Sequence, residues 1–481
     1  MPGNRMTMIK TRFAPSPTGY LHVGGLRTAL FNYLFARRNR GIFVLRIEDT
    51  DQSRQVEGAV DDLIDTFAAL GIQFDEGPAQ GGSSGPYYQS QRLTIYRVHV
   101  ERLLAVGAAY PCFCSESRLK SVRETRQAEK LNTPYDRLCL SIPADESMEM
   151  MKSRPHVIRL KSPEGETITF QDDIRGTVSF QSDDIDDQVL MKRDGFPTYH
   201  FANVVDDHLM GITHVIRGEE WLPSTPKHIL LYRYFDWEPP VFGHLPLLLN
   251  PDRSKLSKRQ GDVAVEDYLS RGYLPDALIN FVALLGWNPG DDREIFTVSQ
   301  LIREFSIDRI QKSGAVFDVE KLKWMNGVYL KEMPLDQLSE VAKPYFIGAG
   351  MEIPKDEAYS RVVDFARKRI SLMTELVSES AFYFVVPEFS QDDIHILRTD
   401  SSQSVLQFWA DQIPKKTNWD ADNIRELLLS TTETLHIKGR DLYFPLRIAL
   451  YGSCHGPDIP ALVDILGSEK VLIRLIRALH Q

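Results

Sequence analysis

Two stretches that lie far apart in the sequence combine residue types suited to binding a phosphorylated nucleotide. Residues 11–25 read TRFAPSPTGYLHVGG and end in His22, Gly24 and Gly25. Glycines keep no side chain between the backbone and a flat ring or a phosphate, and a helix starting here would offer N–H groups and its positive dipole end. Residues 255–259 read KLSKR and follow a turn, so their cations can close over phosphates. Taken singly, each stretch also fits a plain strand-to-helix corner or a solvated basic patch.

The apolar spacing around these stretches predicts the elements that position them. Residues 26, 29, 30, 33 and 34 recur at helical intervals, so a helix begins near His22 or Val23. The β-rich run 41–47 and the helical stretch 57–70 follow. This alternation favours a parallel sheet with ligands at the carboxyl ends of its strands. Glu48 falls at such an end, where it could hold an ammonium group or simply cap a helix.

The later sequence changes character several times. Residues 112–190 contain short β-like pieces between polar turns, and 196–221 read as further sheet-like material with polar groups inside apolar runs. Polar groups in such places need partners, which makes them candidates for a binding site. Residues 275–287 have the punctuation of a helix, and from about 326 onward the pattern is helical throughout. Neither a GxxxxGK[ST] nor a well-placed GxGxxG motif is present, which excludes two rival nucleotide folds.

Bulk composition is that of an ordinary globular protein. The 481 residues suggest about three domains, with 43% apolar and 25% charged residues. No apolar run has membrane-spanning length and the first residues lack a signal-peptide core, so a cytoplasmic location without membrane contact is expected. The formal net charge of −10 counts mildly against a nucleic-acid partner, unless cations gather on one face of an otherwise acidic protein.

Four motifs, in their order along the chain, resemble those of one enzyme family. RFAPSPTG at 12–19 with HVGG at 22–25 resembles the HIGH region of class I aminoacyl-tRNA synthetases, in the form used by the glutamyl branch. KLSKR at 255–259 resembles the KMSKS loop of that class, and RIEDTD at 46–51 and RGEEW at 217–221 resemble two further blocks of the branch. The resemblance covers about the first 330 residues, and beyond them only length and helical character agree.

The resemblance implies an α/β fold: a Rossmann-like doubly wound parallel sheet with an inserted α+β domain, followed by an all-α carboxyl-terminal region. The expected parts are the first half of the catalytic domain (1–111), an inserted tRNA acceptor-binding domain (112–190), the second half of the catalytic domain (191–250), a stem-contact helical domain with the KLSKR loop (251–325) and a helical anticodon-binding region (326–481).

The activity implied by the resemblance is the ATP-dependent attachment of L-glutamate to tRNA in two steps. Glutamyl-adenylate forms with release of pyrophosphate, and the glutamyl group then moves to the terminal ribose of tRNA. Magnesium is expected to accompany ATP. The implied catalytic residues are His22, Lys255, Lys258 and Arg259; those for ATP are Thr18, His22, Gly24, Gly25, Glu220, Trp221 and Lys258; those for glutamate are Arg12, Ser16, Glu48, Tyr199, Asn203 and Arg217.

Chemistry suggests how the glutamate residues divide their work. A guanidinium binds a carboxylate bidentately, so Arg217 is expected to hold the side-chain carboxylate, with Arg12 beside it. Glu48 is expected to hold the α-ammonium group, while Ser16, Tyr199 and Asn203 complete the walls. Such a pocket should reject glutamine, because a neutral amide would leave a buried guanidinium unpaired.

The resemblance also implies a zinc site in the insertion, as in the zinc-bearing members of the family. Cys112, Cys114 and Cys139 supply three thiolates, which suit a tetrahedral structural site when a fourth donor joins them. Position 141 is a serine and not a histidine, so Tyr135 is the remaining candidate. A vestigial site with reduced, buried cysteines is equally consistent with the sequence.

Three other functions stay open at this point. The chain could charge glutamine, or it could attach glutamate to a modified tRNA base, although proteins of the latter kind resemble only the catalytic half. It could also be a catalytically idle tRNA-binding protein, against which the intact His22 and KLSKR motifs argue. The sequence does not tell whether tRNA for glutamine is charged as well as tRNA for glutamate, and a monomer is the default oligomeric state.

Overall fold

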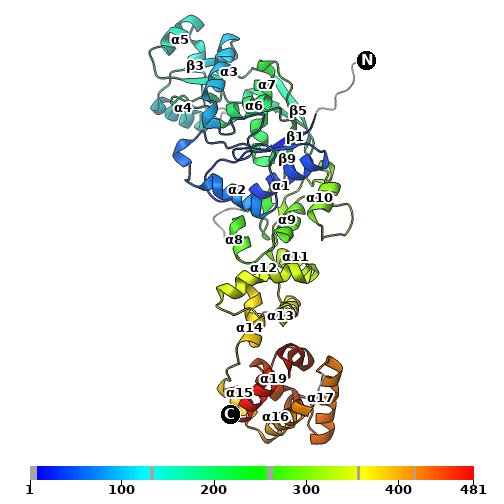
Figure 1. Ribbon diagram of the computed structural model, residues 1–481. Coiled ribbons are helices and arrows are strands. Elements are labelled where there is room, and N and C mark those ends of the chain that lie inside the picture. The colour runs from blue at the N-terminus through cyan, green and yellow to red at the C-terminus, as the bar shows by residue number, and fades with distance from the viewer. Residues whose placement is uncertain (1–7, 131–134, 257–263, 355–357, 416–418) are drawn as a thin grey trace, which may run out of the picture. The chain divides into compact units, whose positions relative to one another are not determined.

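The computed structural model describes residues 8–130, 135–256, 264–354, 358–415 and 419–481 (Figure 1). The chain divides into two compact units. The first comprises the residues up to Ser270 together with Leu274–Leu322, and the second comprises Arg271–Tyr273 and Lys323–Gln481. Within these described ranges, no helix is long and apolar enough to cross a membrane.

Short parallel strands with crossover helices form the centre of the first unit. Strand β1 (Lys10–Phe13) pairs in parallel with β2 (Ile42–Leu45), and α1 (Val23–Arg38) connects them. Strand β8 (His214–Gly218) pairs in parallel with β9 (Val241–Leu245) through α7 (Thr225–Phe235). The Thr213 N–H donates to the carbonyl of Lys10, which brings the start of β8 beside β1. These β-α-β units confirm the predicted α/β fold with parallel strands.

Burial explains why α1 forms where the periodicity predicts it. The helix begins at Val23, and Leu26, Leu30 and Leu34 on its apolar face are fully buried. Its outer side contacts α9 (Pro275–Ala283) and α10 (Val298–Glu304). The loop at its amino-terminal end, which carries the first motif, is therefore fixed to the sheet on one side and to a helical layer on the other.

The inserted segment contains both helices and antiparallel strands. Strands β3 (Ala109–Cys112), β4 (Val157–Leu160) and β7 (Val189–Met191) form one antiparallel sheet. A hairpin of β5 (Thr167–Asp172) and β6 (Gly176–Gln181) joins β9 through the pairing of Asp172 with Phe242. One cluster of buried apolar residues includes side chains from the insertion and from α6 and α7, so the insertion shares the core of the first unit.

The first unit contains further helices and strands. They are α2 (Ala59–Ala69), α3 (Leu93–Ala105), α4 (Glu116–Ala128), α5 (Ala144–Met151), α6 (Tyr199–Leu209), β10 (Leu248–Leu249), α8 (Val265–Ser270) and β11 (Ala315–Val316), and α11 (Val319–Glu332) runs across the boundary between the units. Of these elements, α3 and α6 contribute to the core of the first unit.

The sheet-like interpretation of the residues after 196 is confirmed for 214–218, which form strand β8, and wrong for 199–209. Residues Tyr199–Leu209 form helix α6, in which Phe201, Ala202, Val204 and Val205 are fully or almost fully buried. The consecutive buried residues look like a strand because the helix packs on more than one face, and periodicity alone does not separate a buried helix from a strand. The helix matters for function because it carries Tyr199, Asn203 and two buried aspartates toward the centre of the unit.

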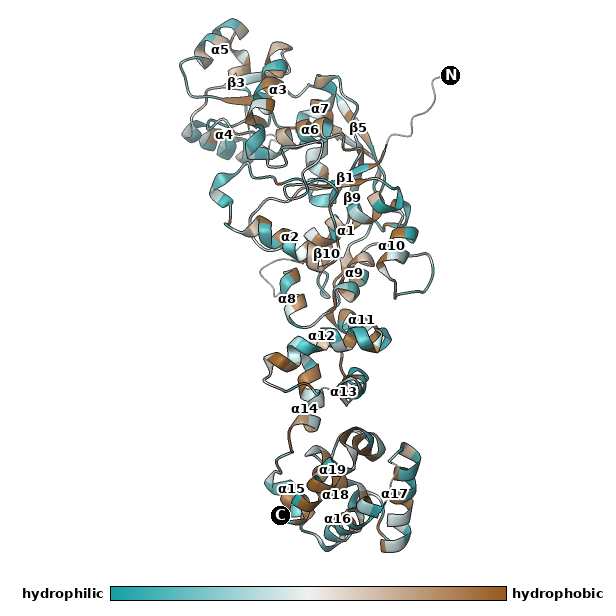
Figure 2. Cartoon of the chain, in the orientation of Figure 1, coloured by the Kyte–Doolittle hydropathy of each residue, from teal (hydrophilic) through white to brown (hydrophobic). Residues whose placement is uncertain are grey.

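The second unit is helical, as predicted. Its helices are α12 (Leu335–Gly348), α13 (Ala358–Arg367), α14 (Leu376–Phe384), α15 (Gln391–Leu397), α16 (Asp400–Gln412), α17 (Ala421–Leu435), α18 (Arg440–Tyr451) and α19 (Ile459–Leu479). Apolar residues gather where α16, α18 and α19 meet (Figure 2), and Trp409, Leu446 and Leu475 are fully buried there.

Candidate functional site

A cavity of about 710 Å³ lies in the first unit, at the end of the sheet where the parallel strands β1, β2 and β8 finish. Open α/β sheets bind their ligands at this edge. The residues of the sequence-predicted site that line the cavity are Arg12, Ser16, Thr18, Gly24, Gly25, Glu48, Tyr199, Arg217, Glu220 and Trp221. The structure therefore brings both predicted subsites, one for a nucleotide and one for an acidic amino acid, to a single cavity.

Arg217, at the end of β8, is a buried guanidinium whose hydrogen-bond partners are uncharged. Its Nε donates to Nε2 of His244 (3.1 Å), Nη1 pairs with Nδ1 of His228 (3.4 Å) and Nη2 donates to Oγ1 of Thr225 (2.9 Å). The ion pairs among the described residues give it no carboxylate partner. Burial lowers the pKa of Arg217, which nevertheless stays positive in neutral solution.

Arg12, the second predicted guanidinium, is already paired. Its Nε and Nη2 donate to the two carboxylate oxygens of Asp207 on α6, at 3.1 and 3.3 Å, and both residues are buried. Arg46 donates to the same aspartate at 2.7 Å and to Glu48 at 3.0 Å. A buried charge is costly without a partner of opposite charge. Asp207 neutralises the charge of Arg12, so of the two predicted guanidinium groups Arg217 is the one that can pair with an anionic ligand.

Glu48 presents one carboxylate oxygen to the cavity. Both hydrogen bonds that it accepts from described residues fall on Oε1, from Arg46 and from Nδ2 of Asn203 (3.1 Å), which leaves Oε2 for a ligand. Burial raises the pKa of Glu48, and the charges of Arg46 and Arg12 oppose that rise. Asn203 does not line the cavity, so its part is to orient this carboxylate.

The aromatic side chains of Tyr199 and Trp221 form a wall next to Arg217. Their ring centroids lie 4.3 Å apart with planes inclined by 35°, and both residues line the cavity. The Tyr199 hydroxyl lies close enough to Arg217 to act as a hydrogen-bond partner that supports the charged guanidinium. A flat apolar wall with one polar tip suits a small polar ligand.

His22 caps helix α1 and does not line the main cavity. Its Nδ1 accepts a hydrogen bond from the Gly24 N–H at 3.0 Å, so the ring proton resides on Nε2, which can donate to a phosphate oxygen. One N–H expected to be free for a nucleotide is therefore occupied by the histidine itself. His22 lines a smaller pocket of about 120 Å³ that shares Ser16, Thr18 and Gly25 with the main cavity.

The residues that follow the KLSKR motif contact the first motif. Ala264 forms an antiparallel bridge with His22, and the N–H of Val265 donates to the carbonyl of Leu21 at 2.9 Å. Lys255 pairs with Leu249 and does not line the cavity. Lys258 and Arg259 lie outside the described residues. Because Ala264 is five positions beyond Arg259, the chain places the two motifs within reach of each other.

Several residues that line the cavity escaped the sequence reasoning. Thr28, Asp51, Arg54, Lys192 and Thr198 all contribute to its wall. Lys192 donates to the carbonyl of Thr50 at 3.0 Å and pairs with Asp194 at 3.2 Å. The sequence around Lys192 contains no motif that would indicate a binding residue. Asp51, in contrast, is the last residue of the RIEDTD motif and Arg54 lies three positions after it, so both could have been found from the motif.

Acid is expected to destabilise the first unit because its buried histidines remain neutral. Burial is the main cause that lowers the pKa values of His228 and His244 below 6.5. In the unfolded chain these residues take up protons near pH 6.5, so the unfolded state binds more protons and unfolding becomes easier as the pH falls. We expect about 1–2 kcal/mol less unfolding free energy per histidine at pH 5 than at pH 7.5. Denaturant titrations at the two pH values measure the unfolding free energy. Equal unfolding free energies at both pH values would contradict the claim that these histidines are neutral in the folded protein.

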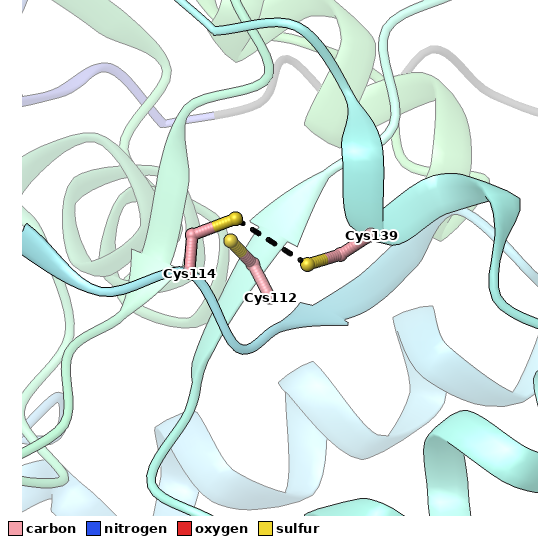
Figure 3. Close-up of side chains that lie close together, drawn as sticks. All are labelled: Cys112, Cys114 and Cys139. Carbon is pink, nitrogen blue, oxygen red and sulfur yellow. Dashed lines mark hydrogen bonds between the residues drawn. The ribbon is translucent and has the colours of Figure 1, made fainter. Parts of the chain in front are cut away.

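Three cysteines of the insertion lie close together (Figure 3). The Sγ atoms of Cys112, Cys114 and Cys139 all lie within 4.8 Å of one another, with 3.5 Å between those of Cys114 and Cys139. The Tyr135 hydroxyl lies 3.4 Å from Sγ of Cys112. Thiolates bound to one tetrahedral zinc ion stand about 3.8 Å apart, so this donor set fits such an ion. Reduced cysteines without metal fit the same burial.

Comparison with protein families decides which of the possible folds and activities apply. Residues 8–324 match the model of the catalytic domain of class I tRNA synthetases (E and Q), which is more than half of the chain. The chain belongs to this family. Residues 337–479 match a second model, described as an anticodon binding domain. The two matches fall almost entirely within the first and the second unit, respectively.

Relatives agree over the whole length of the chain. Glutamate–tRNA ligase of Chlorobaculum parvum is 47% identical and the alignment covers 98% of each chain; that of Clostridioides difficile is 45% identical, with 97% and 98% covered. Among solved structures, a glutamate tRNA ligase of Elizabethkingia meningosepticum in complex with its amino acid has a TM-score of 0.90 at 36% identity, covering 98% of this chain and 99% of that one. The similarity to the family, which the four motifs indicate for the first 330 residues, therefore extends through the helical second unit.

Proposed function

We propose that this chain is a ligase that activates L-glutamate with ATP and attaches it to tRNA. The observation that carries the proposal is Arg217, a buried cation that lines the cavity and whose hydrogen-bond partners among the described residues are uncharged. A guanidinium in this state favours a ligand with a carboxylate side chain over its amide. The names of the relatives, which are glutamate–tRNA ligases over almost their full length, support the same substrate.

Glutamate binds with its side chain toward Arg217 and its α-ammonium group toward Oε2 of Glu48. Ser16 and Tyr199 enclose it, Asn203 holds Glu48 in place, and Arg12 supports this wall through its pair with Asp207. Trp221, which packs on Tyr199, belongs to the ATP subsite. The α-carboxylate then points to the part of the cavity lined by Thr18, Gly24 and Gly25, where ATP places its α-phosphate. Glu220 borders this part and contributes to the ATP subsite.

The first step needs positioning more than proton transfer. An oxygen of the substrate α-carboxylate attacks the α-phosphorus of ATP, the bond to the bridging oxygen breaks, and pyrophosphate leaves with its electron pair. The nucleophile is already ionised, so no general base is required. His22 donates from Nε2 to a phosphate oxygen as negative charge builds, and Thr18 does so through its hydroxyl. A terminal ribose hydroxyl of tRNA then takes the glutamyl group and AMP leaves.

The KLSKR motif supplies the positive charge for the departing pyrophosphate. We assign this role to Lys258, with Lys255 and Arg259 in support, and we expect Mg²⁺ to enter with ATP. The bridge between Ala264 and His22 supports the assignment, because it ties the chain that follows the motif to the nucleotide end of the cavity.

The other parts of the chain contact tRNA in this proposal. The insertion, residues 112–190, binds the acceptor end; residues 251–325 contact the stem; the helices beyond 326 read the anticodon, in keeping with the description of the matched model. The catalytic domain comprises 1–111 and 191–250. Action as a monomer in the cytoplasm is part of the proposal, and light scattering of the purified chain tests the oligomeric state.

We also propose that Cys112, Cys114, Cys139 and Tyr135 hold one structural zinc ion. The ion would crosslink β3 to the segment around Cys139 and so stabilise the insertion. Elemental analysis of the purified chain should give about one zinc per chain. Cys139→Ser should abolish it, whereas Cys454→Ser in the second unit should retain it. A metal-free wild-type chain whose four cysteines, those of the insertion included, all titrate as thiols would instead establish the vestigial site.

Charging assays test the proposed function directly. Purified chain, ATP, Mg²⁺ and tRNA for glutamate should yield glutamyl-tRNA from labelled glutamate, and labelled glutamine should give at least about 10³-fold less product. Parallel reactions with tRNA for glutamine determine whether the second tRNA is also a substrate. Preference for glutamine, or no charging at all in the presence of active control enzyme and tRNA, would overturn the proposal.

A further inference from the structure

A line of buried side chains passes through Arg217 on the side away from the cavity. A guanidinium only donates hydrogen bonds, so Nε2 of His244 and Nδ1 of His228 both present lone pairs to it. The other nitrogen of each histidine then carries the proton. His244 donates from Nδ1 to Oδ2 of Asp172 at 2.5 Å, and His228 donates from Nε2 to Nδ1 of His200 at 3.0 Å. We call Asp172, His244, Arg217, His228 and His200 the histidine line.

The histidine line is sealed from solvent at its centre. His228 is 1% exposed and His244 is fully buried, while Asp172 accepts the N–H groups of Ile174 and Arg175 as well as that of His244. Each ring therefore has one tautomer and one orientation fixed by its neighbours. Five different elements supply the residues, namely β5, β9, β8, α7 and α6, so the guanidinium is fixed relative to the whole sheet.

The acceptors on Arg217 differ in kind from those on Arg12. Arg12 is neutralised by the carboxylate of Asp207, whereas imidazole nitrogens fix a guanidinium without adding negative charge. Arg217 has five N–H donors, and its three bonds to His244, His228 and Thr225 use one on each nitrogen. One N–H on each Nη takes no part in these three bonds, and Arg217 lines the cavity.

We propose that His244 and His228 are positioning residues that determine the specificity of the side-chain subsite. They hold the Arg217 fork in one orientation and keep its charge unneutralised, so that the subsite accepts a carboxylate and rejects an amide. The inference rests on the proposed function, since it needs glutamate as the ligand of Arg217. Asp172 and His200 act one step further out, by fixing the tautomers of the two histidines.

Matched histidine variants test the proposal by ATP–pyrophosphate exchange with glutamate and with glutamine. His244→Phe keeps most of the volume and removes the acceptor; we expect the KM for glutamate to rise about 10- to 100-fold, with the KM for ATP changed by less than about twofold. Discrimination against glutamine should fall about tenfold or more. His244→Gln retains an acceptor for Arg217 and should recover most of the loss. His214→Phe, a histidine of β8 that does not contact Arg217, is the control.

The outcomes separate the inference from the function it rests on. Wild-type chain without glutamate-dependent exchange when tRNA for glutamate is present would refute the proposed function itself. An active wild type, together with a His244→Phe variant that changes KM for glutamate and ATP alike or matches His214→Phe, would refute the histidine line. If His244→Phe does not fold, the pair His228→Leu and His228→Asn decides in the same way, because asparagine reproduces the Nδ1 acceptor.

Discussion

The Arg217→Ala variant should lose affinity for glutamate and retain its affinity for ATP. We expect kcat/KM for glutamate to fall about 10²- to 10³-fold in exchange assays, because a carboxylate brought into the cavity would lose its guanidinium partner and stay desolvated. The KM for ATP should stay within about threefold, since the nucleotide end of the cavity is built from the first motif and not from β8. Folding should persist, because removal of Arg217 takes away a buried charge whose partners are neutral.

Two further variants serve as comparisons for Arg217→Ala. Arg217→Lys retains the charge and removes the fork, so it should bind glutamate better than the alanine variant and discriminate less well against glutamine. Arg233→Ala removes a half-exposed arginine of α7 that pairs with Glu166, and it should behave as wild type. Equal losses for glutamate and ATP in Arg217→Ala would reject its assignment to the amino-acid side chain.

Lys258→Ala should slow adenylate formation by about two to three orders of magnitude, the effect of removing one preorganised cation from the transition state. Single-turnover formation of glutamyl-adenylate measures this step. The affinity for glutamate should remain, because the amino-acid subsite is formed by β8, α6 and the first motif. The lysine belongs to the KLSKR motif, whose following residues pair with His22 and Leu21.

An exposed lysine provides the control for Lys258→Ala. Lys152 pairs only with Glu149 at the surface, with 71% of its side chain exposed, and Lys152→Ala should leave the rate of adenylate formation unchanged. Near-normal adenylate formation by Lys258→Ala would remove the KLSKR motif from the chemistry. The same loss in both variants would point to a general effect of charge.

Residue spacing was sufficient to predict the helices and strands that depend only on residues close together in the sequence. The start of α1 at Val23 follows from its apolar periodicity and the two glycines, and the position of Glu48 follows from the strand that precedes it. Most of the cavity wall could be named because the motifs lie at strand ends, which a parallel sheet collects at one edge. The helical second unit follows from the same kind of pattern.

Pairings between distant residues could not be predicted. Nothing near Arg12 indicates that Asp207, 195 positions away, takes up its charge, and nothing near Arg217 indicates the two histidines. The misassigned helix α6 explains part of this, because a strand would have placed Asn203 and Asp207 on one face without defining their partners. Such contacts depend on how β1, β8, β9, α6 and α7 pack together, which local sequence does not specify.

A crystal structure of the chain with a non-hydrolysable glutamyl-adenylate analogue tests the central claim most directly. We predict that the analogue fills the cavity of about 710 Å³, with its side-chain carboxylate on Arg217, its amino group at Oε2 of Glu48 and its phosphate mimic beside Gly24 and His22. An analogue bound elsewhere, or one whose side-chain carboxylate lies away from Arg217, would contradict the assignment of this cavity.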